Sequence, residues 1–148
     1  MTAWLLDTGP LVAFFDRSDA DHEWAKEQWA QAPVPMLTCE PVLAEAAYLL
    51  GEHAGLPSEK ILALFERKVI TVPFSLEAHA GPVAHLLEKY HDQGMQLADA
   101  CLVRMSELKR DCRVFTLDRR DFQVYRRFDR QMIPLVAPST GSDRRLAH

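Results

Sequence analysis

The stretch AWLLDTGPL, residues 3–11, decides the fold class, because a buried strand there passes directly into a helix. AWLL is a short apolar run that ends at Asp7, which is typical of a strand buried on both faces. Thr8 is then predicted to cap a helix, with Pro10 tolerated in its first turn. A strand followed at once by a helix favours a parallel sheet, in which helices connect successive strands.

The same alternation continues along the chain. Further apolar runs suited to short strands are PMLT (35–38), VITV (69–72), RVFTL (113–117) and MIPLV (132–136). Segments with helical spacing or helix-capping residues lie between them, over residues 19–31, 39–52, 57–68, 76–90 and 96–109. This order predicts an α/β fold, a sandwich with a mainly parallel central sheet and helices on both faces. We expect one domain over residues 1–137 and a flexible tail over 138–148.

The composition is that of a soluble globular protein, with 48% hydrophobic and 26% charged residues. No apolar stretch approaches the roughly 18 residues of a membrane-spanning helix, and no basic segment precedes the first apolar run as in a secretory signal. The three cysteines show no Cys-x-x-Cys spacing and are predicted to be small core residues in a reducing compartment. We therefore expect a cytoplasmic protein without a membrane partner.

The charges are unevenly distributed along the chain. Residues 1–103 carry 6 basic and 15 acidic groups, a net of −9, whereas residues 104–130 carry 9 basic and 5 acidic groups, a net of +4. The acidic bulk argues against a protein that simply coats nucleic acid, but the basic segment leaves room for a local phosphate-binding face.

Within that segment, DRRDFQVYRRFDRQ (118–131) mixes arginines with aromatic residues. Its candidate contacts to nucleic-acid phosphates are Arg119, Arg120, Arg126 and Arg127, and its aromatic side chains are candidates for base stacking. An amphipathic surface helix with its aromatics in the core explains the same pattern equally well.

Four carboxylates stand apart from the other acidic residues by their position. Asp7 and Asp118 each follow a predicted strand directly, and the carboxyl ends of parallel strands share the edge where ligands bind. Glu45 interrupts the apolar helix PVLAEAAYLL (41–50) and is expected to face the interior, where an unpaired carboxylate is costly. Asp99 interrupts the apolar segment LADACLV near the start of its helix, where the helix dipole alone also favours an acid.

Carboxylates that converge at one sheet edge repel one another unless a cation lies between them. No Cys or His accompanies them at ligand spacing, which argues against zinc, and a set of oxygen ligands suits Mg²⁺ or Mn²⁺. Such an ion activates water and stabilises the charge of a phosphodiester displacement. Because the chain has no Walker-type glycine loop, a polymeric phosphate substrate fits better than a nucleoside triphosphate.

In their order and spacing, the segments LLDTGPL (5–11), VLAE (42–45), LADA (97–100) and TLDRRDF (116–122) resemble the motifs of the PIN-domain ribonucleases. Within that family the pattern looks like the VapC-like toxins of prokaryotic type II toxin–antitoxin pairs. The resemblance covers roughly residues 3–136 and implies a PIN-like three-layer α/β/α sandwich. It further implies an endoribonuclease that hydrolyses RNA with metal-activated water, a homodimer, and inhibition by a cognate antitoxin.

The resemblance also implies roles for individual residues. The acidic quartet that binds Mg²⁺ or Mn²⁺ is matched by Asp7, Glu45, Asp99 and Asp118. Asp121 matches a further acidic position of some members, and Thr8 matches the hydroxyl residue that helps to order the first loop. Glu40 lies near Glu45 and competes with it as a ligand, although VLAE is the matching motif.

The sequence also allows other functions. PIN domains also act as stand-alone nucleases in RNA processing, and a non-catalytic binding module would keep the fold without the chemistry. A phospho-acceptor receiver domain also gathers aspartates at strand ends, but it needs an acidic pair after the first strand and a late lysine. Here Asp7 stands alone and no lysine follows Lys109.

Overall fold

A computed structural model describes residues 1–139 of the chain. Its central sheet has five parallel strands in the order β3-β2-β1-β4-β7, so that the first strand lies at the centre. The strands are β1 (Ala3–Leu6), β2 (Met36–Leu37), β3 (Ile70–Thr71), β4 (Cys112–Phe115) and β7 (Leu135–Val136). Leu6 pairs with Phe115 in the register of β1 and β4, which brings the ends of these two strands to the same level.

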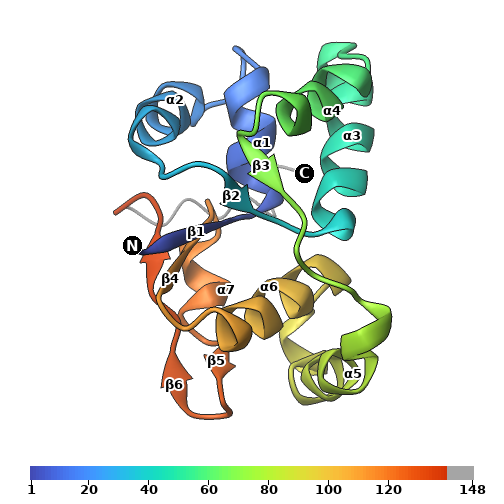
Figure 1. Ribbon diagram of the computed structural model, residues 1–148, viewed down its shortest axis with the longest axis vertical. Helices are drawn as coiled ribbons and strands as arrows, with labels where there is room; N and C mark the ends of the chain where they lie inside the picture. The colour runs from blue at the N-terminus through green and yellow to red at the C-terminus, as the bar shows by residue number, and fades with distance from the viewer. Residues whose placement is uncertain (140–148) are drawn as a thin grey trace.

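Helices cover both faces of the sheet, which confirms the predicted three-layer α/β/α sandwich. The helices are α1 (Thr8–Phe15), α2 (His22–Gln31), α3 (Glu40–Ala54), α4 (Glu59–Glu66), α5 (Ala80–Lys89), α6 (Leu97–Leu108) and α7 (Arg119–Phe122), with 3₁₀ turns η1 (Glu77–His79) and η2 (His91–Gln93). Helices α1 to α4 lie on one side of the sheet, and α5 and α6 lie on the other (Figure 1).

The buried face of each helix follows from its apolar spacing. In α3 the fully buried row is Val42, Ala46 and Leu50, four residues apart. The core between the layers also contains side chains of β1 and β4: Leu5 and Val114 are both fully buried. The three cysteines are buried and form no disulfide, as their apolar contexts predict. Within residues 1–139, no helix is long and apolar enough to cross a membrane.

The start of α1 differs from the prediction. Asp7, and not Thr8, is the cap: its Oδ1 accepts a hydrogen bond of 2.8 Å from the Thr8 backbone N–H. Thr8 is instead the first residue of the helix. The physical reason is that a carboxylate in extended backbone can reach the unpaired N–H groups of the first turn better than a residue already inside the helix.

The basic segment is also not the single amphipathic helix that its pattern allowed. It forms the short α7 and then an antiparallel hairpin of β5 (Arg126–Arg127) and β6 (Gln131–Met132). Between these strands, Phe128 and Asp129 both have left-handed backbone, with φ of 53° and 64°. The hairpin lies beside α6, below the sheet in Figure 1.

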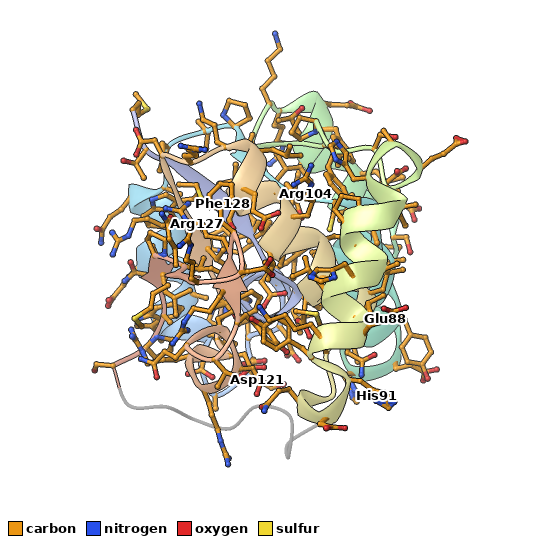
Figure 2. The ribbon with its side chains drawn as sticks, turned by 90° about the horizontal axis from the view of Figure 1, so that it is seen from below. Glu88, His91, Arg104, Asp121, Arg127 and Phe128 are labelled. Atoms are coloured by element: carbon orange, nitrogen blue, oxygen red, sulfur yellow. The ribbon has the colours of Figure 1, made fainter. Side chains whose placement is uncertain are left out.

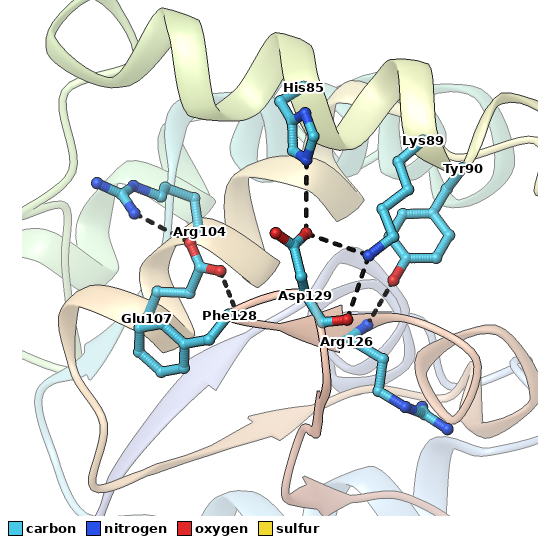
Figure 3. A network of polar contacts seen from close by, with 8 residues as sticks. All are labelled: His85, Lys89, Tyr90, Arg104, Glu107, Arg126, Phe128 and Asp129. Carbon is cyan, nitrogen blue, oxygen red and sulfur yellow. Dashed lines mark hydrogen bonds and ion pairs between the residues drawn. The ribbon is translucent and has the colours of Figure 1, made fainter.

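Polar contacts hold this strained turn against the neighbouring helices (Figure 3). A Glu107 carboxylate oxygen on α6 accepts a bond of 2.6 Å from the Phe128 backbone N–H, while its other oxygen pairs with Arg104 at 3.0 Å. The Asp129 carboxylate lies 3.1 Å from Lys89 Nζ of α5. These fixed partners offset the cost of two left-handed residues without glycine. Of the predicted tail, residues 140–148 lie outside the described part of the chain.

Candidate metal centre

A cavity of about 260 Å³ opens at the carboxyl edge of the sheet. All four carboxylates of the predicted quartet line it, although they come from four distant parts of the chain: Asp7, Glu45, Asp99 and Asp118. Val12, Leu49 and Leu117 supply apolar walls. Glu40 does not line this cavity, so the structure separates it from Glu45.

Asp7 is the most enclosed of the four. It follows β1 and is buried, with both carboxylate oxygens engaged. Oδ1 accepts from the Thr8 N–H, and Oδ2 accepts from the Thr116 hydroxyl at 2.6 Å. Because each oxygen retains a second lone pair, these bonds orient the carboxylate without preventing it from binding a cation.

Thr116 also connects Asp7 to Asp118. Its fully buried hydroxyl donates to Asp7 and accepts a bond of 2.9 Å from the Asp118 backbone N–H. Asp118 in turn caps α7 by accepting from the Asp121 N–H at 3.2 Å. Thr116 was missed by the sequence reasoning, although a hydroxyl inside the apolar strand RVFTL, two residues before Asp118, was a usable signal.

Asp99 is held at the start of α6. Its Oδ2 accepts from the Gln96 backbone N–H at 3.0 Å, and the Gln96 side chain accepts in return from the backbone of Asp99, so the two form a capping box. The Tyr125 hydroxyl lies 3.5 Å from the same Oδ2. Asp99 is therefore a structural residue at a helix start, and it also lines the cavity.

Tyr125 does not have the role that its sequence context suggested. Together with Phe122 it is fully buried, and the two rings pack edge to face with centroids 5.2 Å apart. Neither ring is accessible for base stacking, so this part of the prediction was wrong. Burial of Tyr125 instead places its hydroxyl against the Asp99 carboxylate.

Glu45 corrects a second expectation. Its side chain is exposed at the mouth of the cavity and does not face the interior. The reason is helical geometry: the buried row of α3 runs through Val42, Ala46 and Leu50, and Glu45 lies about 100° round the helix from Ala46. The cost of a buried charge therefore falls on Asp7 and Asp99, whose side chains are both buried.

The carboxylates of the cavity repel one another, and burial together with this repulsion raises the pKa of the most enclosed one. Burial, followed by repulsion from Asp99 and more weakly from Glu45, raises the pKa of Asp7 to about 7. The hydrogen bonds from Thr116 and Thr8 oppose this rise only in part. Among residues 1–139, no Lys, Arg or His lines the cavity to neutralise its carboxylates. A bound cation would supply that missing charge.

The donors fit a hydrated divalent ion better than a closed metal cage. In the described part of the chain, no three Asp, Glu, His or Cys side chains already converge as ligands on one point. The buried Thr8 hydroxyl, which lines the cavity, has no hydrogen-bond partner in residues 1–139. Mg²⁺ keeps several of its waters and binds through one or two carboxylates, so its water ligands suit both the spacing of the acids and this hydroxyl.

Three of the four arginines predicted to contact nucleic acid bond to the protein's own backbone. Arg119 donates to the Ala137 and Pro138 carbonyls, both at 2.8 Å. Arg127 donates to the Ser106 and Arg110 carbonyls at 3.1 and 2.9 Å. Arg126 donates to the backbone carbonyls of its own loop, those of Gln123, Val124 and Tyr125. Arg120 is exposed. Figure 2 shows Arg127 and Phe128 on the hairpin, well apart from Asp121 on the same face of the molecule.

Comparison with known proteins agrees with this architecture. The sequence model of the PIN domain family matches residues 4–128. The chain is 30% identical over 126 residues to Ribonuclease VapC26 of Mycobacterium tuberculosis (strain ATCC 25618 / H37Rv), covering 82% of this chain and 91% of that protein. Its fold matches the crystal structure of M. tuberculosis VapC20, described as a sarcin–ricin loop cleaving toxin, with a TM-score of 0.67 at 21% identity, over 76% of this chain and 87% of that one.

Proposed function

The chain belongs to the PIN domain family, and from this premise we propose that it is a divalent-metal-dependent endoribonuclease. The observation that carries the proposal is the cavity lined by four carboxylates and no basic side chain among the described residues. The similarity to a relative named as a ribonuclease supports RNA as the substrate.

Asp7 and Asp99 would hold the ion, Mg²⁺ or Mn²⁺, because they are the two buried carboxylates of the cavity. When bound, the ion supplies charge neutralisation and an activated water for attack on phosphorus. Thr116 keeps the Asp7 carboxylate oriented, and the capping box does the same for Asp99. Glu45 and Asp118 are more exposed, and either is suited to accept the proton of the attacking water.

The physiological role that fits best is the toxin of a toxin–antitoxin pair, acting in the cytoplasm. The similarity to VapC proteins supports it, and it brings with it a cognate antitoxin and a homodimer. A stand-alone nuclease of RNA processing would use the same cavity, whereas a non-catalytic binding module would have no use for the four acids.

The test is cleavage of single-stranded RNA with Mn²⁺ by wild type, Asp7→Asn and Asp99→Asn. We expect both variants to lose activity by about 100-fold or more, since each removes a buried metal ligand. Glu40→Gln is the matched control and retains activity, because Glu40 does not line the cavity. Cleavage by both variants at the wild-type rate would overturn the site, and a wild type that neither cuts RNA nor binds Mn²⁺ would favour the binding module.

A further inference from the structure

A second cleft, of about 240 Å³, lies between α2 and the strands β1, β4 and β7. It shares no lining residue with the metal-centre cavity. We refer to it as the α2–β7 cleft; it is lined by Trp4, Trp24, Gln28, Gln31, Arg113, Arg119 and β7 with Ala137. Its volume is several times the roughly 30 Å³ share of one water molecule, so it has room for a small organic group.

Charge and polarity in the α2–β7 cleft suit an anionic ligand. Trp24, Gln28 and Gln31 are spaced i, i+4, i+7 and so present one face of α2 to the cleft. The acidic residues of the helix, Glu23 and Glu27, are exposed and do not line the cleft, although Glu27 flanks the row between Trp24 and Gln31. Among residues 1–139, no Asp or Glu lines the cleft.

Two guanidinium groups stand at the β7 side of the cleft in fixed positions. Arg113 donates to the Leu135 carbonyl at 3.0 Å, and Arg119 donates to the Ala137 and Pro138 carbonyls. A guanidinium has more N–H donors than these bonds use, and its planar fork matches phosphate oxygens. The bonds to the backbone therefore hold both groups ready for an anion and do not exclude one.

The opposite wall offers a rigid aromatic surface. The half-buried Trp24 packs against Phe115 with ring centroids 5.7 Å apart, and Trp4 packs edge to face on the same ring at 5.2 Å. These packed rings give the cleft a rigid wall, while the surface that the cleft exposes is mostly polar.

The chain connects this cleft directly to the metal centre. Asp118 lines the metal-centre cavity, and the next residue, Arg119, lines the α2–β7 cleft. The guanidinium that Arg119 brings to the cleft is therefore attached to the chain one residue after a carboxylate of the metal-centre cavity.

We propose that the α2–β7 cleft binds a nucleotide that flanks the scissile phosphate of single-stranded RNA. Arg113 and Arg119 contact its phosphate, and Gln28 and Gln31 contact the base edge. This subsite rests on the proposed ribonuclease function and deepens it.

The experiment measures binding of a fluorescently labelled single-stranded RNA by anisotropy, in chelator so that no cleavage occurs. Gln28→Glu adds a negative charge inside the cleft and is expected to weaken binding about tenfold, through repulsion of the phosphate. Ala30→Glu adds the same charge to the exposed side of the same helix and is expected to bind within about twofold of wild type.

A second pair of variants tests the same cleft independently, in case Gln28→Glu does not fold. Arg113→Gln is expected to weaken RNA binding, whereas Lys109→Gln removes an equal charge from an exposed site outside the cleft and is expected not to. Equal binding by the cleft variants and their controls would overturn the subsite. Wild-type cleavage of RNA with Mn²⁺ is measured in parallel, so that loss of the subsite alone is distinguished from failure of the ribonuclease function.

Discussion

At the scale of single residues, Asp7 shows how a carboxylate of the site lowers the stability of the fold when it is ionised. Its carboxyl closes β1, caps α1 and faces Asp99 across the cavity, so burial and repulsion raise its pKa from 3.8 to about 7. Between these two pH values the unfolded chain has lost the proton that the folded chain keeps. Asp7 therefore stabilises the metal-free fold fully below about pH 4, and this contribution is lost as the pH rises through 7.

This gives a pH prediction. In chelator, the free energy of unfolding of wild type should fall relative to that of Asp7→Asn by about 1.4 kcal/mol per pH unit between pH 4.5 and 6.5. Urea denaturation at several pH values measures the difference, in which the contributions of groups that do not interact with Asp7 cancel. Parallel curves for the two proteins would show that the Asp7 pKa is not raised in the folded state.

Single residues also show where sequence reasoning succeeds. The placement of Asp7, Asp99 and Asp118 at one cavity could be predicted, because a strand end or a helix start fixes their place along the chain. The placement of Thr116 and Tyr125 beside these residues could not, because their partners, Asp7 and Asp99, are 109 and 26 residues away and only the folded chain brings them together. The exposure of Glu45 was not predicted, because an apolar run alone does not show which face of a helix is buried against the rest of the protein.

At the scale of elements, the cavity is built at helix beginnings. Asp7 caps α1, Asp99 lies in the first turn of α6, and Asp118 caps α7. The N-terminal ends of α1 and α6 carry partial positive charge, which partly offsets the crowded carboxylates. The residue patterns that predict helix starts here therefore also predict which carboxylates line the cavity.

The hairpin β5–β6 is the element that sequence patterns did not reveal. Its turn residues, Phe128 and Asp129, are left-handed without being glycine or asparagine, so the tolerance of aspartate for this backbone is a weak local signal for the turn. Contacts from α5 and α6 hold the turn, and Figure 3 shows them. The continuous helix that the pattern of residues 118–131 allowed as one alternative does not form, because tertiary contacts override local propensity there.

The hairpin leads to a stability prediction. Glu107→Ala should lower the free energy of unfolding by about 2–3 kcal/mol, because it leaves the Phe128 N–H without its charged acceptor and removes the partner of Arg104. Glu88→Ala, at an exposed position of α5, is the control and should change stability by less than about 0.5 kcal/mol. Chemical denaturation checks both; an equal effect of the two substitutions would mean that Glu107 does not hold the turn.

At the scale of the whole molecule, the four site carboxylates come from residues 7, 45, 99 and 118 and meet only in the folded chain. A cation that binds them therefore binds the native state alone, and its binding free energy adds to stability.

The edge of the sheet at β7 is partly protected. Arg113 donates a hydrogen bond to the Leu135 carbonyl, which discourages pairing of this edge with another strand.

Metal addition should raise the midpoint of thermal unfolding. At an Mn²⁺ concentration of 100 times the dissociation constant, the expected gain is about 2.7 kcal/mol. Asp99→Asn should lose most of this gain while keeping its fold, and Glu40→Gln should keep it. Calorimetric scans with and without Mn²⁺ provide the measurement. An unfolding midpoint that does not respond to Mn²⁺ in wild type would contradict a cation site at these carboxylates.

Finally, the caps make the backbone itself a reporter of the site. The amide protons of Thr8, Gln96 and Asp121 are each donated to a carboxylate of the cavity. Each amide proton exchanges with deuterated solvent only when its hydrogen bond to the carboxylate breaks. Binding of a cation to the carboxylate is expected to make this opening rarer. Three amide signals in a nuclear magnetic resonance spectrum can thus follow occupancy of the cavity, without a substrate and without any change to the chain.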